Sequence, residues 1–109
     1  MGLTKTEIFN EKQNKLATMF KALAHPARIA ILQQIINASA CICGDLSTEL
    51  GLAQPTISQH LKELKNAGLI KGTIEGASVC YCIDQVKWAE LKEQLNTLLS
   101  SADLNNSCC

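Results

Sequence analysis

The side chains with the most distinctive chemistry in this sequence are six cysteines, which occur in three close pairs. Two thiolates held close together favour chelation, and thiolate is a soft ligand that selects thiophilic ions over magnesium, calcium or manganese. The amino-terminal segment is charged and lacks the apolar stretch of a secretion signal, so we expect free thiols in a cytoplasmic protein rather than a disulfide framework. The pairs are Cys41 with Cys43, Cys80 with Cys82, and Cys108 with Cys109.

A spacing of two residues, as in the first two pairs, suits β-strands, in which alternate side chains share one face. We predict a short strand at residues 40–43, with Ile42 pointing inward and both cysteines on the outer face. Cys80 and Cys82 alternate with Val79, Tyr81 and Ile83, so they share the face opposite that apolar set. If the two strands are neighbours, the four thiols converge.

The number of converging thiols would decide which ion is bound. Three thiolates suit trivalent arsenic or antimony, and four suit cadmium, lead or zinc. We expect such an ion to act as a signal, and we predict no constitutive cofactor. Cys108 and Cys109 end a tail, residues 102–109, which we expect to be flexible and able to reach either subunit of a dimer.

Two other interpretations of the cysteines stay open. They can be small apolar residues that only pack, or they can sense oxidants or persulfides by forming a disulfide with no metal. Histidine offers little support for a metal site. His25 precedes Pro26 at a predicted helix start, where we expect a structural role, and His60 falls in a polar helix face.

The segment between the two strands, residues 46–70, has the pattern of two short helices around a tight turn. The first helix carries Leu46 and Leu50 and is predicted to end at Gly51, a residue suited to the left-handed conformation. The second is predicted to have Gln54 as its cap and Pro55 at its first position. Proteins present a helix to the major groove of DNA in this way, although an ordinary helical hairpin has the same spacing.

The second helix of this segment has one apolar stripe and a polar remainder. Ile57, Leu61 and Leu64 recur at helical spacing and should be buried. Glutamine can read adenine bidentately, serine and threonine can contact bases or phosphates, and lysine can neutralise a phosphate. We therefore predict that this helix reads double-stranded operator DNA through Gln54, Thr56, Ser58, Gln59, His60 and Lys62.

The elements around this helical pair complete the predicted fold, which is mainly α with a small β-hairpin wing. A hairpin with a Gly-bearing loop follows residue 69, and a reading helix followed by a hairpin is the winged helix-turn-helix arrangement. Helices are predicted at about residues 6–23, from Pro26 onward, and at about residues 85–101. We expect the first and last helices to form a two-fold dimer interface, although both could pack only on their own domain.

Composition is consistent with one domain covering residues 1–109. The apolar fraction is 47% and the net charge is zero, which argues against a nonspecific polyelectrolyte binder. No apolar run approaches the roughly 18 residues of a membrane helix. No nucleophile, base and orienting group can be recognised together, so we do not expect an enzyme. The expected partners are operator DNA and a second copy of the chain, with no membrane and no other protein partner.

Three motifs in this chain resemble the ArsR/SmtB family of winged-helix repressors. They read FKALAHPARIAILQQI, DLSTELGLAQPTISQHLKELKNAGLI and GxxxCYCI, and the similarity covers about residues 16–100. The resemblance implies a dimeric repressor that leaves DNA when a metal ion, metalloid or thiol-reactive signal reaches cysteine or histidine ligands. The positions that resemble the family's DNA contacts are Gln54, Thr56, Ser58, Gln59 and His60.

The cysteine pattern most resembles that of the family's arsenic sensors, which carry Cys-x-Cys just before an Asp-Leu pair. Here Gly44 moves Cys41 and Cys43 one residue further from Asp45, and Ser47 stands where a third cysteine would be. Ala53 also replaces a serine common in the family. The expected function is a repressor released when trivalent arsenic or antimony binds cysteine thiolates. A redox- or persulfide-sensing repressor, or a sensor of cadmium, lead or zinc, is the alternative.

Overall fold

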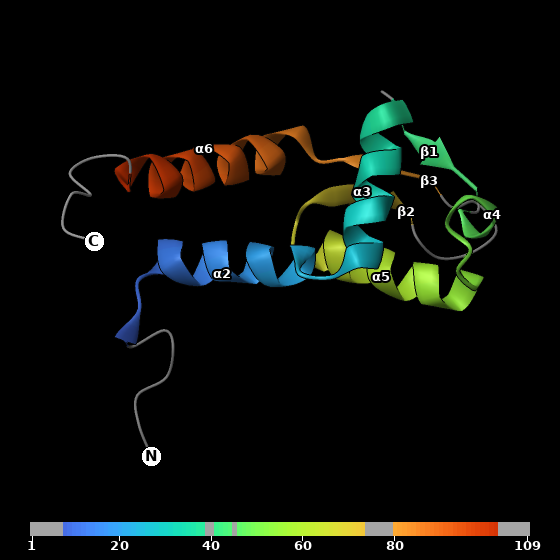
Figure 1. The fold of residues 1–109 in the computed structure, drawn as a ribbon, viewed down its shortest axis with the longest axis horizontal. Helices are drawn as coiled ribbons and strands as arrows, with labels where there is room; N and C mark the ends of the chain where they lie inside the picture. Colours follow the sequence, from blue (N-terminus) through green and yellow to red (C-terminus); the bar gives the residue numbers. More distant parts are fainter. Residues whose placement is uncertain (1–7, 39–40, 45, 74–79, 103–109) are drawn as a thin grey trace, which may run out of the picture.

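The computed structural model describes residues 8–38, 41–44, 46–73 and 80–102. Helices α2 and α3 come first, a two-strand hairpin follows the helix-turn-helix pair, and a last helix closes the chain (Figure 1). The predicted class, mainly α with a small sheet in a winged helix-turn-helix, is confirmed. The elements are α2 (Glu11–Leu23), α3 (Pro26–Ala38), β1 (Ile42–Cys43), α4 (Ser47–Leu50), α5 (Gln54–Asn66), β2 (Ile70–Thr73), β3 (Cys80–Ile83) and α6 (Gln85–Ser101).

The start of α2 differs from the prediction of a helix from about residue 6. Helix α2 begins at Glu11 because Asn10 caps it. The Asn10 Oδ1 atom accepts from the Gln13 backbone N–H at 2.8 Å, and the Gln13 Oε1 atom accepts from the Asn10 N–H at 3.0 Å. This reciprocal pair satisfies two N–H groups that a helix start leaves without partners, which fixes the boundary. The predicted residues 6 and 7 lie outside the described residues.

The start of α5 also differs by one residue from the prediction. Gln54 is the first helical residue and not the cap, and the cap is Ala53, which makes no side-chain hydrogen bond. The extended backbone of Ala53 lets its carbonyl accept from the Ile57 N–H at 3.1 Å, so the helix starts on backbone geometry alone. The Gln54 side chain instead donates from Nε2 to the Ser58 Oγ atom at 3.2 Å.

The hydrophobic core lies where α2, α3 and α5 meet the sheet. The stripe predicted for α5 is buried as expected, with Leu64 fully inaccessible to solvent. Tyr81 and Ile83 supply the inner face of β3, which confirms their predicted side. The largest fully buried side chains are Met19, Ile31, Ile35, Ile57, Leu61, Leu64, Leu69, Ile70 and Tyr81.

The sheet has the strand order β1-β3-β2, and both pairings are antiparallel. A third strand beside the hairpin was predicted, and the structure has it at Ile42–Cys43. Gly72, opposite Tyr81, has a φ of +130°, and a Cβ there would collide with the Cys80 carbonyl oxygen. Only glycine fits this close approach of two strands. The predicted wing loop, residues 74–79, lies outside the described residues.

Helix α6 starts beside the sheet and contacts α2, and its far end lies at the end of the molecule opposite α4 (Figure 1). An ion pair joins the two helices, with Lys15 Nζ 3.1 Å from Glu90 Oε2. On α6, Leu91 is buried in the core of its own domain, whereas Leu98 and Leu99 are 52% and 60% exposed. The apolar residues of this helix are therefore only partly covered within one chain. None of the described helices combines the length and the apolarity needed to cross a membrane.

Candidate DNA-reading helix and cysteine site

Helix α5 carries all six residues predicted to contact DNA. Its apolar stripe packs against the core, and this fixes the direction of the remaining side chains. Thr56 and Gln59 are exposed, whereas Ser58, His60 and Lys62 are half-buried. Gln59 donates from Nε2 to the Glu63 Oε1 atom at 3.3 Å, so its amide is oriented along the outer face of the helix. Among the six residues predicted to contact DNA, Gln59 is therefore the one whose side chain is best oriented to reach the edge of a base.

His60 lies against α3. Its Nδ1 atom accepts a hydrogen bond from Arg28 Nε at 3.2 Å, and its ring centroid is 4.5 Å from that of His25. Arg28 also donates from Nη1 to the Ala22 carbonyl oxygen at 3.3 Å. Burial lowers the pKa of His60 below its ordinary value, and His25 and Arg28 lower it further. The geometry makes His60 a link between the two helices.

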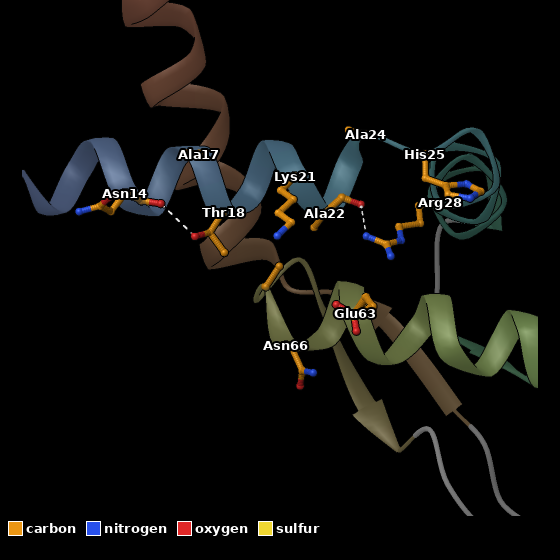
Figure 2. A pocket seen from close by; sticks show the side chains of 11 residues that line it. Asn14, Ala17, Thr18, Lys21, Ala22, Ala24, His25, Arg28, Glu63 and Asn66 are labelled. Carbon is orange, nitrogen blue, oxygen red and sulfur yellow. Dashed lines mark hydrogen bonds between the residues drawn. The ribbon is translucent and has the colours of Figure 1, made fainter. Parts of the chain in front are cut away.

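Sequence reasoning missed Arg28, although a lone arginine near the start of an apolar helix was a signal that it has a partner. His25 has the structural role that was expected, since its Nδ1 atom accepts from the Ala27 backbone N–H at 3.0 Å near the start of α3. A cavity of about 640 Å³ lies between α2, α3 and α5, and His25, Arg28 and Glu63 are among its lining residues (Figure 2). Lys65, in the last turn of α5, donates from Nζ to the Gly72 carbonyl oxygen at 2.7 Å and so ties the helix to β2.

The register of β1 on β3 sets Cys43 directly opposite Cys80, and the two are joined by a disulfide. The expectation that these cysteines are free thiols is therefore wrong for this pair. The physical reason is the cross-strand register, which brings the two Cα atoms to 4.0 Å and points both side chains from one face. The spacing of cysteines in the sequence could not reveal this register.

Cys41 and Cys82 form a second pair beside the first. The pairing of Ile42 with Tyr81, continued by one residue along both strands, places Cys41 opposite Cys82. The neighbouring Cys41 thiol, ahead of burial, raises the pKa of Cys82. Because residues two apart in a strand share a face, the structure brings Cys41, Cys43, Cys80 and Cys82 together on one side of the sheet.

The disulfide leaves two thiols of these four free. Within the described ranges, no group of three or more histidine, cysteine or acidic side chains is arranged to hold a metal ion. A three- or four-thiolate site would need the Cys43–Cys80 bond to be reduced, so the metal site stays a prediction. Cys108 and Cys109, predicted as further ligands, lie outside the described residues.

Comparison with known proteins identifies relatives along most of the chain. A family model described as "Bacterial regulatory protein, arsR family" matches residues 25–71. An uncharacterised HTH-type transcriptional regulator of Methanocaldococcus jannaschii, MJ1325, is 45% identical over 80 residues, covering 71% of this chain and 89% of its own length. The biofilm growth-associated repressor of Xylella fastidiosa is 26% identical over 97 residues, covering 89% of this chain and 84% of its own length.

Solved structures agree with the sequence relatives. One described as reduced HlyU from Vibrio cholerae superposes with a TM-score of 0.61 at 29% identity, covering 88% of this chain and 97% of its own. ArsR-family regulators bind DNA, typically as dimers, and are not enzymes. The fold and these relatives together establish that this chain is a transcriptional regulator of the ArsR family.

Proposed function

We propose that this chain is a cytoplasmic, homodimeric repressor whose affinity for operator DNA depends on whether Cys43 and Cys80 are joined. The observation that carries the proposal is the disulfide between two strands that lead into different parts of the molecule. Strand β1 runs into the helix-turn-helix, and β3 runs into α6. A disulfide between these strands therefore couples the position of the DNA-reading helix α5 to that of α6, the helix expected to form the dimer interface.

The oxidation needs only a peroxide and the two thiols. The peroxide transfers one oxygen to the first thiol, giving a sulfenic acid, and leaves as water. The second thiol then displaces the sulfenic hydroxyl, which departs as water with that thiol's proton, and the sulfur–sulfur bond forms. A reducing dithiol reverses the change. Cys43 is exposed and Cys80 is half-buried, so a small oxidant can reach the pair.

The disulfide lies close to groups that fix both helices. Leu46, three residues after Cys43, is 4% exposed in the core and leads directly into α4. On the other strand, Ile83 is buried, and the Asp84 Oδ1 atom accepts from the Lys87 N–H at 3.2 Å to cap α6. A small shift of β1 relative to β3 would therefore also move α4 and α6, which are packed or capped right after these strands. A coupling of about 1–3 kcal/mol, or roughly 5- to 150-fold in affinity, is typical of such regulation.

The relatives support both parts of this proposal. The Xylella relative is described as a repressor, and the Vibrio relative is known in a form described as reduced. Transcriptional repression and a role for thiol oxidation are each consistent with those descriptions. Neither description names arsenic.

The test measures binding of the chain to its own promoter DNA by fluorescence anisotropy, once fully reduced and once oxidised with peroxide. We expect oxidation to weaken binding by about tenfold or more, and Cys43→Ser and Cys80→Ser to bind tightly in both conditions. A Cys108→Ser, Cys109→Ser variant is the matched control and should still respond. Full response to peroxide in both single variants would disprove the proposed switch.

Trivalent arsenic or antimony is the second candidate signal, with cadmium, lead or zinc as further possibilities. It is favoured by one observation, the placement of four cysteines at neighbouring positions on one sheet face. After reduction of the disulfide, three thiolates from Cys41, Cys43, Cys80 and Cys82 would suit arsenic, and all four would suit cadmium. Stoichiometric arsenite that releases the reduced protein from DNA without forming a disulfide would support this signal over oxidation.

A further inference from the structure

The cavity between α2, α3 and α5 lies beside the face of α5 that is expected to read DNA. Gln59, Glu63 and Asn66 are four and three residues apart, so they form one row along the helix. Gln59 is exposed, and Glu63 and Asn66 line the cavity of about 640 Å³. The cavity therefore begins one helical turn beyond Gln59, and a molecule that contacts Gln59 also passes beside the cavity.

Two cationic side chains line this cavity from the elements that face α5. Lys21, in the last turn of α2, and Arg28, on α3, point toward the space between α2 and α5 (Figure 2). Lys21 is exposed, and among the residues that the structure describes it has no ion-pair partner. Its ammonium group is therefore available to an anion outside the chain.

Arg28 is held in place by the protein and still has donors to offer. It donates from Nε to the His60 Nδ1 atom at 3.2 Å and from Nη1 to the Ala22 carbonyl oxygen at 3.3 Å. These bonds use two of the five N–H groups of a guanidinium. Because the side chain is already ordered, a further bond to a phosphate costs little additional conformational entropy.

The charge of the cavity lining matches a singly charged anion. Lys21 and Arg28 oppose Glu63, which leaves an excess of one positive charge when His25 is neutral. The Glu63 carboxylate already accepts from Gln59 Nε2 at 3.3 Å, so it is partly engaged within α5. Each phosphodiester of a DNA strand carries one negative charge, and this equals the excess.

We propose that this cavity holds a phosphodiester of the DNA strand that borders the groove occupied by α5, with Lys21 and Arg28 as its donors. The major groove is about 12 Å wide, so a helix within it has a sugar-phosphate backbone along each flank. The junction of α2 and α3 forms one flank of α5 and meets that backbone. Such contacts set the orientation of the reading helix without reading sequence. The inference rests on DNA binding by the proposed repressor and not on the state of Cys43 and Cys80.

The variant Lys21→Gln tests this contact through the salt dependence of DNA binding. Each neutralised phosphate adds about 0.9 to the slope of log affinity against log salt, and a dimer loses two such contacts. Between about 50 and about 200 mM salt, the affinity of the variant should therefore fall about tenfold less than that of the parent protein. The same difference should appear with operator and with unrelated DNA. Fluorescence anisotropy of the reduced protein measures both.

Lys12→Gln is the matched control. Lys12 is also an exposed lysine of α2, but it lies nine residues earlier, on the opposite face, and does not line the cavity. Its salt dependence should equal that of the parent. Circular dichroism and sedimentation check that both variants keep the fold and the oligomeric state of the parent. If Lys21→Gln has the salt dependence of the parent, the cavity holds no phosphate and the proposal is wrong.

Arg28 needs two variants because it also links α3 to α5. Arg28→Lys and Arg28→Gln both remove the guanidinium that bonds His60, but only the glutamine variant loses the positive charge. We expect Arg28→Lys to keep the salt dependence of the parent and Arg28→Gln to show the weaker dependence of Lys21→Gln. Equal salt dependence in the two variants would make Arg28 a structural link and remove it from the phosphate site.

Glu63→Gln distinguishes a bound phosphate from a bound cation. This change keeps an acceptor for the Gln59 amide and removes the one carboxylate of the lining. It should strengthen binding of unrelated DNA at least about threefold, because a repulsion is lost. Unchanged or weaker binding would contradict a phosphate at this position.

Failure of this inference is distinct from failure of the proposed function. Every comparison above is made between variants in the reduced state, whereas the switch is tested by comparing two redox states of one chain. A parent protein that binds no DNA would refute the repressor itself and this inference with it.

Discussion

His60 gives the protein a pH dependence that can be worked out from its surroundings. His25, just before α3, and Arg28, on α3, face it, and Glu63 lies one turn further along α5. Burial, followed by His25 and Arg28, holds the pKa of His60 below its ordinary value of 6.5. As the pH falls through that value, the unfolded chain binds a proton that the folded chain resists, so stability decreases.

The variant His60→Gln tests this effect. Glutamine can still accept from Arg28 but does not titrate, so the loss of stability between about pH 7.5 and about pH 5.5 should be smaller than in the parent protein. Thermal unfolding at the two pH values provides the measurement. An equal decrease in melting temperature in both proteins would show that other groups cause the pH dependence.

We expect substitution of Gln59 to weaken base recognition without affecting folding. Gln59→Ala removes an exposed amide and no core contact, so folding should be unaffected while operator affinity drops by about 1–3 kcal/mol. Gln33→Ala, an exposed glutamine on α3, is the matched control and should bind normally. Anisotropy titrations with operator and with unrelated DNA measure the effect. If Gln59→Ala keeps the parent protein's ratio of operator affinity to affinity for unrelated DNA, Gln59 does not face the bases.

Residue spacing predicted part of the site and could not predict the rest. The alternation of cysteines with apolar residues placed four thiols on strand faces, because that depends only on the period of a strand. Pairing of Cys43 with Cys80 depends on register, which is set by how the core packs. The hydrogen bond between Arg28 and His60 joins positions 32 apart in the sequence, beyond the reach of any local pattern.

At the level of elements, Gly72 is the residue on which the wing pairing most depends. Gly72→Ala would place a Cβ against the backbone of Cys80 and Tyr81, so β2 and β3 must separate. Gly51→Ala is the control, since Gly51 also has a positive φ (+69°) but has open space around it. We expect the control to lose about 1–2 kcal/mol of stability and Gly72→Ala distinctly more. Urea unfolding measures both, and equal losses would contradict the close approach.

Element boundaries show where prediction from sequence reaches its limit. The start of α3 and both bounds of α6 agree with the prediction, because proline fixes the first and apolar periodicity the second. The starts of α2 and α5 were predicted wrongly, since the Asn10–Gln13 capping box and the backbone cap at Ala53 depend on local geometry that side-chain periodicity does not report.

For the whole molecule, the exposed apolar end of α6 predicts the site of subunit pairing. Leu98 and Leu99 lie on the helix that packs beside α2, and neither is covered within one chain. A Leu98→Asp, Leu99→Asp variant should remain folded, sediment as a monomer and bind its operator more weakly, because two half-sites are then no longer bound together. Ile29→Asp, also exposed but on α3, is the control. Analytical ultracentrifugation measures the oligomeric state of each variant. If the double variant is still a dimer, the subunit interface lies elsewhere.

The Cys43–Cys80 bond joins positions 37 apart and closes a covalent ring around α4, α5 and β2, with α2 and α6 outside it. By the chain-entropy relation, a ring of this size restricts the unfolded chain by about 4 kcal/mol. A protease that cuts once inside the ring leaves the two pieces linked until a reductant is added, whereas a cut in α2 or α6 releases a fragment at once. Oxidation therefore makes the DNA-reading unit a closed loop that a single backbone break cannot separate.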